Sequence, residues 1–246
     1  MAQADFHFHA ELNFFLPPNR RQVSFTHFFK GRASIKDMIE SLGVPHPEVD
    51  SIQVNGESVD FSYIVQDGDR IDVYPISAAD QVTSTLRVGP TEVPCRFVLD
   101  IHLGKLANSL RLLGFDTLYR NDYADEELAQ ISATQQRILL TRDKGLLMRS
   151  MVTYGYYVRE TDPDRQVVEV LRRFGLFELS KPFQRCIRCN GLLKPVAKES
   201  ILDQLPAKTQ LSINEFHRCG ECAQIYWKGA HYERILQFIE GVLSAQ

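Results

Sequence analysis

The stretch FVLDIHLGKLANSLRLLGFDT, residues 97–117, decides the fold of this chain. Its apolar start predicts a buried strand, and its end, from Phe115 onward, predicts the beginning of a second strand. Between the two strands, apolar residues recur at helical spacing: Leu103, Leu106, Ala107, Leu110 and Leu113. Gly114 follows directly and is the expected C-terminal stop of that helix. The stretch therefore predicts a strand, a helix and a strand in succession.

The same alternation of strands and helices continues toward the C-terminus. Strands are predicted over 137–141 and 156–160, and helices over 125–135, 145–152 and 163–174. Strands that are regularly separated by helices form a parallel sheet with helices on both faces. The predicted fold class is therefore α/β.

The first 75 residues have a different rhythm. Two alternating segments, 6–16 and 21–29, precede a short amphipathic helix over 34–43, and further strands follow over 49–57 and 65–75. Asn-Gly and Asp-Gly pairs predict the turns. This order resembles the β-grasp, ubiquitin-like fold, and the ending VQDGDRIDVYP is similar to that of sulfur-carrier members. Sulfur carriers end in a free Gly-Gly, whereas this chain continues, so we expect a docking or substrate-handling module.

Composition indicates an ordinary globular protein, since 44% of its 246 residues are hydrophobic and 24% are charged. No run approaches the roughly 18 apolar residues of a membrane span, and the N-terminus lacks the pattern of a signal peptide. These features predict a cytoplasmic protein with no membrane partner. Charge is uneven: basic against acidic residues number 7 against 12 in 1–90, 12 against 13 in 91–180 and 9 against 6 in 181–246. A polyanion is therefore expected to meet the C-terminal part.

Aspartates follow the predicted strands of the α/β sheet. Asp100 ends the first strand and Asp143 follows the strand over 137–141, while Asp122 and Asp125 lie between the second strand and its helix. Sites in open parallel sheets form beyond the C-terminal ends of the strands, so these carboxylates are expected at one edge. Clustered carboxylates repel each other without a cation, and oxygen-only ligands suit Mg²⁺ or Mn²⁺. We predict a hard-cation site that hydrolyses phosphodiester bonds.

Each of these four acids also has a structural interpretation, because aspartate is favoured as the N-cap of a helix. Basic neighbours are open in the same way: Lys105 and Arg142 either contact phosphates or lie at solvated helix ends. Asp116 is expected to be structural, and Asp162 is expected to cap a helix. Spacing alone leaves these alternatives open.

Several segments together resemble one family. They are FVLDIHLGKLANSLRLLGFDT, DYADEELAQISATQQRILLTRDKGLL and a C-terminal pattern of two C-x-x-C pairs that ends in YWKGAH. In this order they resemble the PIN-like ribonuclease domain found at the C-terminus of the mutator-seven exoribonucleases. Prokaryotic members often carry a ubiquitin-like domain in front, which is similar to the arrangement expected here. The resemblance covers about residues 95–240.

The resemblance implies roles and domain boundaries. Asp100 corresponds to the first metal-binding acid of PIN nucleases, Asp125 to the acid on the intervening helix and Asp143 to the acid after a central strand. The implied organisation has four parts: a ubiquitin-like β-grasp domain over 1–80, a linker over 81–94, a PIN-like catalytic domain over 95–180, and a zinc ribbon with a C-terminal helix over 181–246.

Four of the five cysteines form two C-x-x-C pairs, Cys186 with Cys189 and Cys219 with Cys222. Each short loop presents two thiolates to one side of a metal, so the pairs predict a tetrahedral structural zinc site. The long insert between the pairs is expected to add strands or a short helix. Cys95 lies outside the set and is expected to be a buried apolar residue.

Basic and aromatic residues surround the cysteine pairs, which favours RNA as the partner. The basic residues are Arg185, Arg188, Lys194, His217, Arg218, Lys228, His231 and Arg234. Among them, Lys228 and His231 are open candidates for RNA contacts. Tyr226 and Tyr232 suit stacking on unpaired bases, and we expect Trp227 to pack the ribbon against the α/β domain.

These observations together predict a metal-dependent ribonuclease. Asp100, Asp125 and Asp143 are predicted to hold Mg²⁺ or Mn²⁺, the four paired cysteines Zn²⁺, and the β-grasp domain is expected to meet a protein partner. The alternative is a non-catalytic RNA-binding module, in which the zinc ribbon binds RNA and the β-grasp domain recruits a partner. Turnover that depends on an added metal distinguishes the two.

Overall fold

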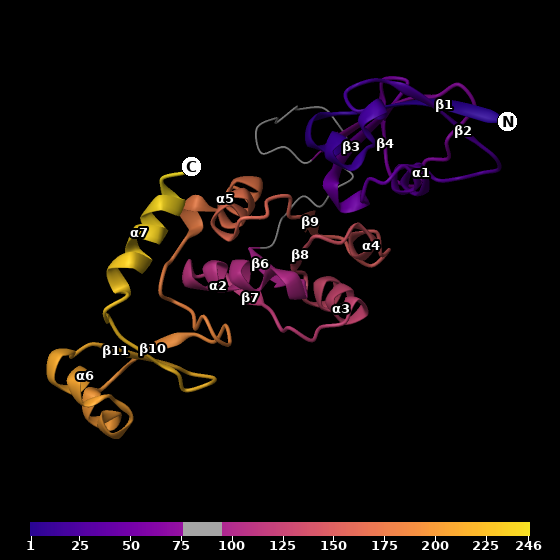
Figure 1. Ribbon diagram of the computed structural model, residues 1–246. Coiled ribbons are helices and arrows are strands. Elements are labelled where there is room, and N and C mark those ends of the chain that lie inside the picture. The colour runs from indigo at the N-terminus through magenta and orange to yellow at the C-terminus, as the bar shows by residue number, and fades with distance from the viewer. Residues whose placement is uncertain (76–94) are drawn as a thin grey trace. The chain divides into compact units, whose positions relative to one another are not determined.

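The computed structural model describes residues 1–75 and 95–246 of the chain (Figure 1). The linker predicted over 81–94 lies outside the described residues. None of the described helices is long and apolar enough to cross a membrane.

Contacts divide the described residues into two compact units. The first unit holds 1–75 and 122–159, and the second holds 95–121 and 160–246. Each unit therefore combines two stretches that are separated in the sequence. The boundary near residue 180 between catalytic domain and ribbon stays a prediction.

A five-stranded mixed sheet in the order β2-β1-β5-β3-β4 forms the N-terminal part of the first unit. Its strands are β1 (Ala2–Phe8), β2 (Phe25–Phe29), β3 (Val49–Val54), β4 (Glu57–Val59) and β5 (Arg70–Pro75). β1 pairs in parallel with β5, and the other pairings are antiparallel. The helices are α1 (Ile35–Ser41) and the 3-10 turns η1 (Ala10–Phe15), η2 (Pro18–Arg20) and η3 (His46–Glu48). The order of strands and helix is the one that the alternating segments predict, but the strand predicted over 6–16 is wrong in extent. β1 ends at Phe8, and the 3-10 helix η1 takes up most of the remaining segment.

The core of this sheet follows from alternation along its strands. Successive side chains of a strand point to opposite faces, so every second residue of β1 is buried. One face of α1 adds further apolar side chains. Together they form one buried cluster that includes Ala4, Phe6, Phe8, Ile35, Ile39, Ile52 and Ile71.

Local signals fix the ends of these elements. Ser34 caps α1, because its hydroxyl accepts a hydrogen bond from the Asp37 amide at 3.1 Å. Asn55 and Gly56 both have positive φ, at 54° and 87°, which is the backbone of a tight hairpin turn. The Asn-Gly turn between β3 and β4 is therefore confirmed.

The second stretch of the first unit contains α3 (Asp125–Gln135), β8 (Ile138–Thr141), α4 (Lys144–Leu147) and β9 (Gly155–Tyr157). β8 and β9 pair in parallel. α3 covers the predicted helix, but the helix predicted over 145–152 is wrong in length. The chain leaves α4 after one turn, and a hydrogen bond of 2.9 Å from the Val152 amide to the Arg149 carbonyl closes the next turn. This turn buries Val152.

The β-grasp domain packs on this α/β stretch through Glu48 in η3. The Glu48 side chain is fully buried and accepts hydrogen bonds from the Tyr157 amide at 2.7 Å and the Arg159 guanidinium at 2.9 Å. The guanidinium also lies 5.3 Å from the centre of the Phe15 ring. Burial acts against the charge of Arg159, but the Glu48 carboxylate outweighs it and raises the pKa of Arg159.

His46 supplies a second link between the same two stretches. Its Nε2 lies 2.8 Å from the Val152 carbonyl oxygen, and its Nδ1 lies 2.6 Å from the Glu40 carboxylate. A side chain at Gly155 would stand 3.3 Å from Pro47, so the two stretches approach closely there. The β-grasp domain of the first unit thus has a defined partner surface within its own chain.

The second unit begins with β6 (Arg96–Leu99), α2 (Gly104–Leu112) and β7 (Asp116–Leu118), and it continues with α5 (Pro163–Phe174). β6 and β7 pair in parallel. The α/β sheet has the strand order β7-β6-β8-β9. The predicted fold class, a parallel sheet with flanking helices, is confirmed.

Glycines end two helices of this unit, α2 and α5. Gly114 has φ +95°, and a side chain there would overlap the Lys181 carbonyl oxygen. The Lys181 amide donates to the Leu113 carbonyl at 2.8 Å, so the chain that leads into the ribbon is tied to the end of α2. Gly175 ends α5 with φ +63° and has open space around it. Only Gly114 is required by both conformation and contact.

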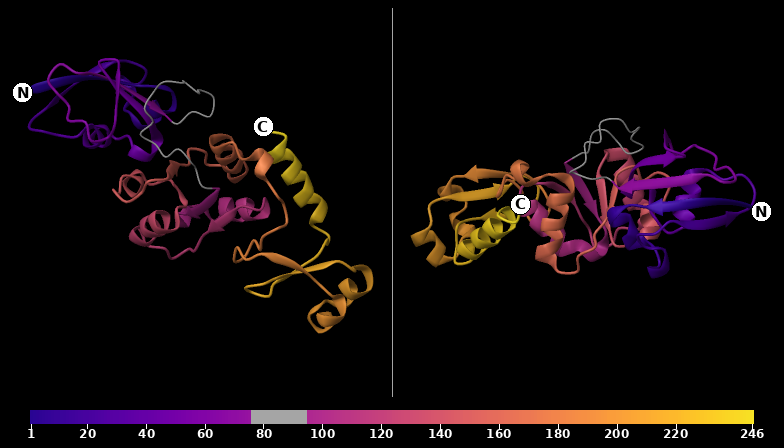
Figure 2. Two further views of the ribbon diagram at one scale, coloured as in Figure 1. Left: turned by 180° about the vertical axis from the view of Figure 1, so that it is seen from behind. Right: turned by 90° about the horizontal axis from the view of Figure 1, so that it is seen from above.

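The C-terminal part of the second unit is a three-stranded antiparallel ribbon. It consists of β10 (Leu193–Val196), β11 (Phe216–Cys219) and β12 (Ile225–Tyr226), with α6 (Ala207–Ser212) in the insert between β10 and β11. The insert therefore adds a short helix, as predicted. α7 (Tyr232–Leu243) follows the ribbon and runs back to contact α5 (Figure 2). A small apolar cluster of Ile201, Leu205, Phe216 and Ile225 holds the insert on the ribbon.

Candidate functional site

The Sγ atoms of the four paired cysteines come together in the ribbon and lie within 4.8 Å of one another. Cys186 and Cys222 are 3.6 Å apart, and Cys189 and Cys219 are 3.4 Å apart. A disulfide bond is about 2 Å long, whereas four sulfurs around a zinc ion at about 2.3 Å stand well over 3 Å from each other. The predicted cluster is therefore confirmed, and its donor set fits a metal ion.

The thiols of the cluster ionise with different ease. Burial disfavours ionisation of the Cys186 thiol, but hydrogen bonds from the Tyr226 hydroxyl, at 3.0 Å, and from backbone amides outweigh burial and lower its pKa to about 7. Burial and the neighbouring thiols raise the pKa of Cys189 to about 12. A second thiolate so close to the first is costly, and a bound cation removes that cost.

Asn190 and Gly191, directly after the first pair, shape the loop that presents it. Asn190 has φ +72°, a conformation that asparagine tolerates better than most residues. A side chain at Gly191 would lie 2.8 Å from the Cys219 Sγ. The Cys186 amide donates to the Gly191 carbonyl at 2.8 Å. The sequence CNG thus closes the loop tightly beside the second cysteine pair.

The same loop is joined to the start of β7. The Asn190 side chain accepts a hydrogen bond from the Thr117 amide at 2.9 Å and donates one to the Asp116 carboxylate at 2.8 Å. Arg111 of α2 is buried, and its guanidinium donates to the carbonyls of Thr117 at 2.9 Å and Ile187 at 3.0 Å. Asp116 is therefore structural, as predicted.

The predicted catalytic aspartates lie at the ends of strands or the starts of helices. Asp143 follows β8 and caps α4, with Oδ1 accepting from the Gly145 amide at 2.7 Å. Its Oδ2 makes no hydrogen bond or ion pair within residues 1–75 and 95–246. Asp125 is the exposed first residue of α3 and makes no cap bond. Helix capping thus explains the hydrogen bonds of one carboxylate oxygen of Asp143, but it does not explain why Asp125 stands at its position.

Asp100 belongs to the second unit and ends β6. It is buried, with 7% of its surface exposed, and it stands before the 3-10 turn Ile101–Leu103. Its side chain makes no cap bond with this turn, although its carbonyl accepts from the Leu103 amide at 3.0 Å. The cap interpretation therefore does not explain why a carboxylate is buried here.

The other residues that the sequence singled out differ in their exposure and contacts. The Arg142 guanidinium donates to the carbonyls of Val158 and Arg159, both at 3.1 Å, which gives it a structural role. Lys105 is exposed on α2, and Asp122 is exposed before α3. Cys95, expected to be buried, is exposed, because the buried part of its strand begins only at Phe97.

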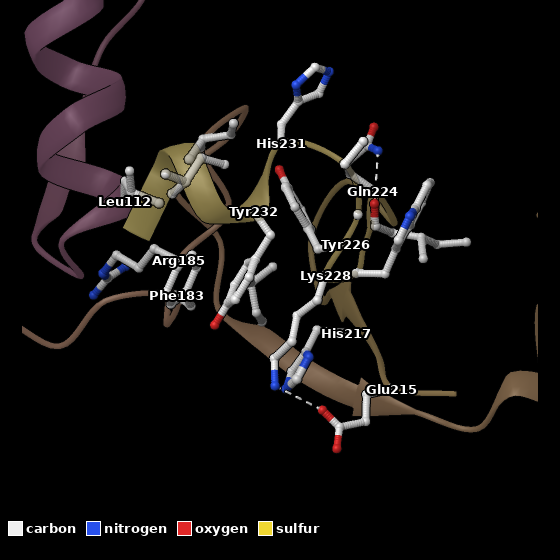
Figure 3. A pocket seen from close by; sticks show the side chains of 17 residues that line it. Leu112, Phe183, Arg185, Glu215, His217, Gln224, Tyr226, Lys228, His231 and Tyr232 are labelled. Atoms are coloured by element: carbon white, nitrogen blue, oxygen red, sulfur yellow. Dashed lines mark hydrogen bonds and ion pairs between the residues drawn. The ribbon is translucent and has the colours of Figure 1, made fainter. Parts of the chain in front are cut away.

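A pocket of about 440 Å³ lies between the ribbon and α7, and Figure 3 shows its lining. Most of the wall is apolar or aromatic and includes Phe183, Tyr226, Trp227 and Tyr232. Trp227, which we expected to pack the ribbon against the α/β domain, instead lines this pocket, is 38% exposed and meets Phe216 of the ribbon itself.

Polar side chains gather on one side of this pocket. Lys228 donates to Glu215 at 3.1 Å, and this hydrogen bond raises the pKa of Lys228. His217 points toward the same two residues, whereas His231 points the other way (Figure 3). Of the two predicted RNA-contact candidates, Lys228 therefore lies in the polar group, and His231 does not.

Comparison with known protein families shows the family to which the chain belongs. Residues 95–239 match the Mut7-C RNAse domain, and residues 1–81 match the Mut7-C ubiquitin domain. The chain belongs to the Mut7-C RNAse domain family. No curated protein and no solved structure matches the chain. The ubiquitin-like domain followed by a Mut7-C domain is the arrangement that the sequence segments predict.

The Mut7-C match includes the cysteine cluster and most of α7. It therefore covers the lining of the pocket, whose last member is Ile235. Phe183 and Glu215 also line the pocket, and the sequence gives no signal for either of them. Phe183 has φ +64°, and no residue pattern announces that conformation at a phenylalanine. A carboxylate close to Lys228 is equally invisible in the sequence, because the two residues are joined only by the fold.

Proposed function

We propose that this Mut7-C protein is a metal-dependent ribonuclease that hydrolyses RNA phosphodiester bonds. The observation that carries the proposal is the match of residues 95–239 to an RNAse domain family. A nuclease-like role follows from that match. Metal dependence and the identity of the catalytic residues rest on the chemistry of the aspartates.

Asp100, Asp125 and Asp143 are proposed to hold Mg²⁺ or Mn²⁺. Strand order in the α/β sheet reverses between β6 and β8, and open sheets bind ligands beyond the strand ends at such a point. Asp100 directly follows β6, and Asp143 stands two residues after β8. Oxygen-only donors of this kind suit hard divalent cations.

The available oxygens support this assignment. Asp143 keeps Oδ2 for a ligand while Oδ1 caps α4, and the cap also fixes the direction of the carboxylate. Asp125 presents its side chain to solvent at the start of α3. A divalent ion bound to such carboxylates activates water and stabilises the negative charge that develops on the phosphodiester.

The cysteine cluster is proposed to hold a structural Zn²⁺ ion. Four thiol donors with no other ligand form a closed site, which is typical of structural rather than catalytic zinc. Its role is to fix the first cysteine loop, and with it Asn190, against β7. RNA is the proposed partner of this region, and a cytoplasmic location stays a prediction.

A protein partner for the β-grasp domain also stays a proposal. Part of its surface is occupied by the contacts of Glu48 and His46 within the first unit. The partner must therefore use another face. The exposed phenyl ring of Phe28 on the edge strand β2, 59% exposed, offers one.

Cleavage of labelled RNA by the purified full chain tests the proposed function. Single-stranded and structured RNAs are incubated with Mg²⁺, with Mn²⁺ and with neither, because a strong chelator would also strip zinc from the cysteines. We expect cleavage only with an added divalent ion, and its loss in Asp100→Asn and Asp125→Asn. Equal cleavage without added metal, or by both variants, would contradict the proposal.

A further inference from the structure

We propose that the pocket between the zinc ribbon and α7 binds one unpaired nucleotide of single-stranded RNA, with the base stacked on the aromatic wall and a phosphate on Lys228. The inference rests on the proposed function for the class of ligand and adds where a base is held. The pocket, at about 440 Å³, lies within the range of about 300–1,000 Å³ typical of small-ligand sites.

The aromatic rings of the pocket are held in place before any ligand arrives. Phe183 and Tyr232 have ring centres 5.5 Å apart, and the Phe183 amide donates to the Leu112 carbonyl at 3.0 Å. The Tyr226 hydroxyl is fixed 3.0 Å from the Cys186 Sγ. Rings that need no reordering suit stacking, and every base offers a flat π-face to such rings.

The charged groups of the pocket match a phosphate next to a stacked base. The Lys228 Nζ lies 5.8 Å from the centre of the Tyr232 ring, and His217 lies beside it (Figure 3). Arg185 also lines the pocket, but its guanidinium donates to the carbonyls of Gly114 and Asn190. Lys228 is therefore the cation that is available to a ligand.

Glu215 currently holds Lys228, and this pair is weak. Their side chains are 61% exposed at Lys228 and 74% exposed at Glu215, and ion pairs in such exposed positions contribute little. Glu215 is the one carboxylate among the lining residues. A phosphate can therefore replace it as the partner of Lys228.

The combination favours single-stranded RNA over a polypeptide or a duplex. An apolar wall beside a cation suits a ligand that has both a flat apolar face and a negative charge, which each nucleotide has. Residues 181–246 carry 9 basic against 6 acidic residues, but zinc bound by four thiolates would add a charge of about −2. Recognition of a phosphate therefore depends on the local position of Lys228 and not on the total charge. A duplex keeps its bases stacked and paired, so it cannot insert one into the pocket without being unpaired.

Trp227 provides a direct readout, because it is the only tryptophan of the chain and lines the pocket. The full chain with Asp143→Asn, which is not expected to cleave, is titrated with an oligouridylate and with a duplex RNA. We expect the single strand to change the fluorescence of Trp227 in a saturable way and the duplex to leave it nearly unchanged.

Variants then test each part of the pocket in the same assay. Tyr232→Leu keeps an apolar side chain but removes a ring, and is expected to weaken RNA binding about fivefold or more. Lys228→Gln is expected to weaken binding and to lower its salt dependence by about one phosphate contact. Glu215→Gln is expected to strengthen binding, because it releases Lys228. Lys208→Gln, on the exposed side of α6 outside the pocket, is the control.

Zinc content of each variant is measured, so that a loss of fold is not mistaken for a loss of contact. Two results would overturn the proposal. One is RNA binding that fluorescence anisotropy detects but that leaves Trp227 fluorescence unchanged. The other is equal RNA binding by Tyr232→Leu, Lys228→Gln and the parent, and in either case a polypeptide would become the better candidate ligand of the pocket. The outcome is independent of catalysis. If the wild-type protein cleaves RNA but the pocket variants bind RNA as the parent does, only the pocket proposal is refuted. If RNA binding depends on the pocket residues but no cleavage occurs, only the proposed nuclease activity is refuted.

Discussion

The Asn190 side chain donates a hydrogen bond to the Asp116 carboxylate at 2.8 Å, across 74 positions of sequence. Its oxygen accepts from the Thr117 amide at the same time. The two segments GFDT and CNG therefore meet in one polar contact between β7 and the first cysteine loop. The α/β part and the ribbon of the second unit are joined at this point by hydrogen bonds with defined geometry.

Replacing Asn190 should disturb this junction strongly. Asn190→Ala leaves the buried Thr117 amide without its acceptor and places alanine at positive φ, which together should cost about 3 kcal/mol of unfolding free energy. Denaturant unfolding followed by the fluorescence of Trp227 measures the effect.

An exchange of the two side chains provides the control. Asn190→Asp alone sets two carboxylates against each other, whereas the double variant Asp116→Asn with Asn190→Asp restores one donor and one acceptor. The double variant should recover most of the stability. Equal loss in the single and double variants would show that this hydrogen bond is not what joins the segments.

Glycine at position 114 should be more important than glycine at position 175. Both have positive φ, but only at Gly114 would a side chain meet backbone, at the Lys181 carbonyl. Gly175→Ala should cost about 1 kcal/mol, and Gly114→Ala about 2 kcal/mol more than that. Thermal unfolding of the two variants side by side measures the difference. Similar losses of stability in both variants would mean that the backbone at the C-terminal end of α2 can shift to make room for a side chain.

The buried pair of Glu48 and Arg159 predicts a coupled effect in the first unit. Glu48→Gln leaves the guanidinium without its counter-charge and should lower the unfolding free energy by about 3 kcal/mol. Adding Arg159→Met removes the stranded charge and should restore part of the loss. A double-mutant cycle by thermal unfolding, with exposed Glu215→Gln as the comparison, tests this. Additive single effects would contradict a direct pairing.

Zinc should depend on the four paired cysteines and not on the fifth. Cys219→Ser removes a buried ligand from a closed site, so the protein should lose its zinc and the first cysteine loop should become accessible to protease. Cys95→Ser changes an exposed cysteine outside the cluster and should keep one zinc ion per chain. Metal analysis of the purified variants decides, and full zinc retention by Cys219→Ser would exclude the assignment.

Hydrophobic periodicity and the residues that start or end helices were sufficient to predict most helices and strands. The leucine spacing before Gly114 and the Asp162-Pro163 start predicted α2 and α5 closely, because caps and apolar faces are local properties. The helix predicted over 145–152 was wrong in length. Its apolar residues continue past Leu147, but the chain uses Val152 to fill the core in a turn.

The candidate sites divide in the same way. The spacing of the cysteines predicts the cluster, because each pair lies within four consecutive residues. The contacts of Glu48 with Arg159, across 111 positions, and of Glu215 with Lys228 depend on tertiary packing and have no local signal. Cys95 was misjudged because the strand it precedes is buried only from Phe97 onward.

The role of Asp143 is the most direct test of the ribonuclease account. Asparagine caps a helix as well as aspartate does, so Asp143→Asn keeps the cap of α4 and removes only the charge that a metal needs. Asp162→Asn makes the same change at the cap of α5, where the side chain accepts from the Asp164 and Arg165 amides at 3.1 Å. Both variants should therefore fold and retain zinc.

The deciding measurement is the rate of RNA cleavage with Mn²⁺ by these two variants and the parent protein. The account predicts that Asp143→Asn loses cleavage by at least about a hundredfold, equivalent to about 3 kcal/mol of transition-state stabilisation, while Asp162→Asn cleaves like the parent. Equal cleavage by Asp143→Asn and Asp162→Asn would contradict it.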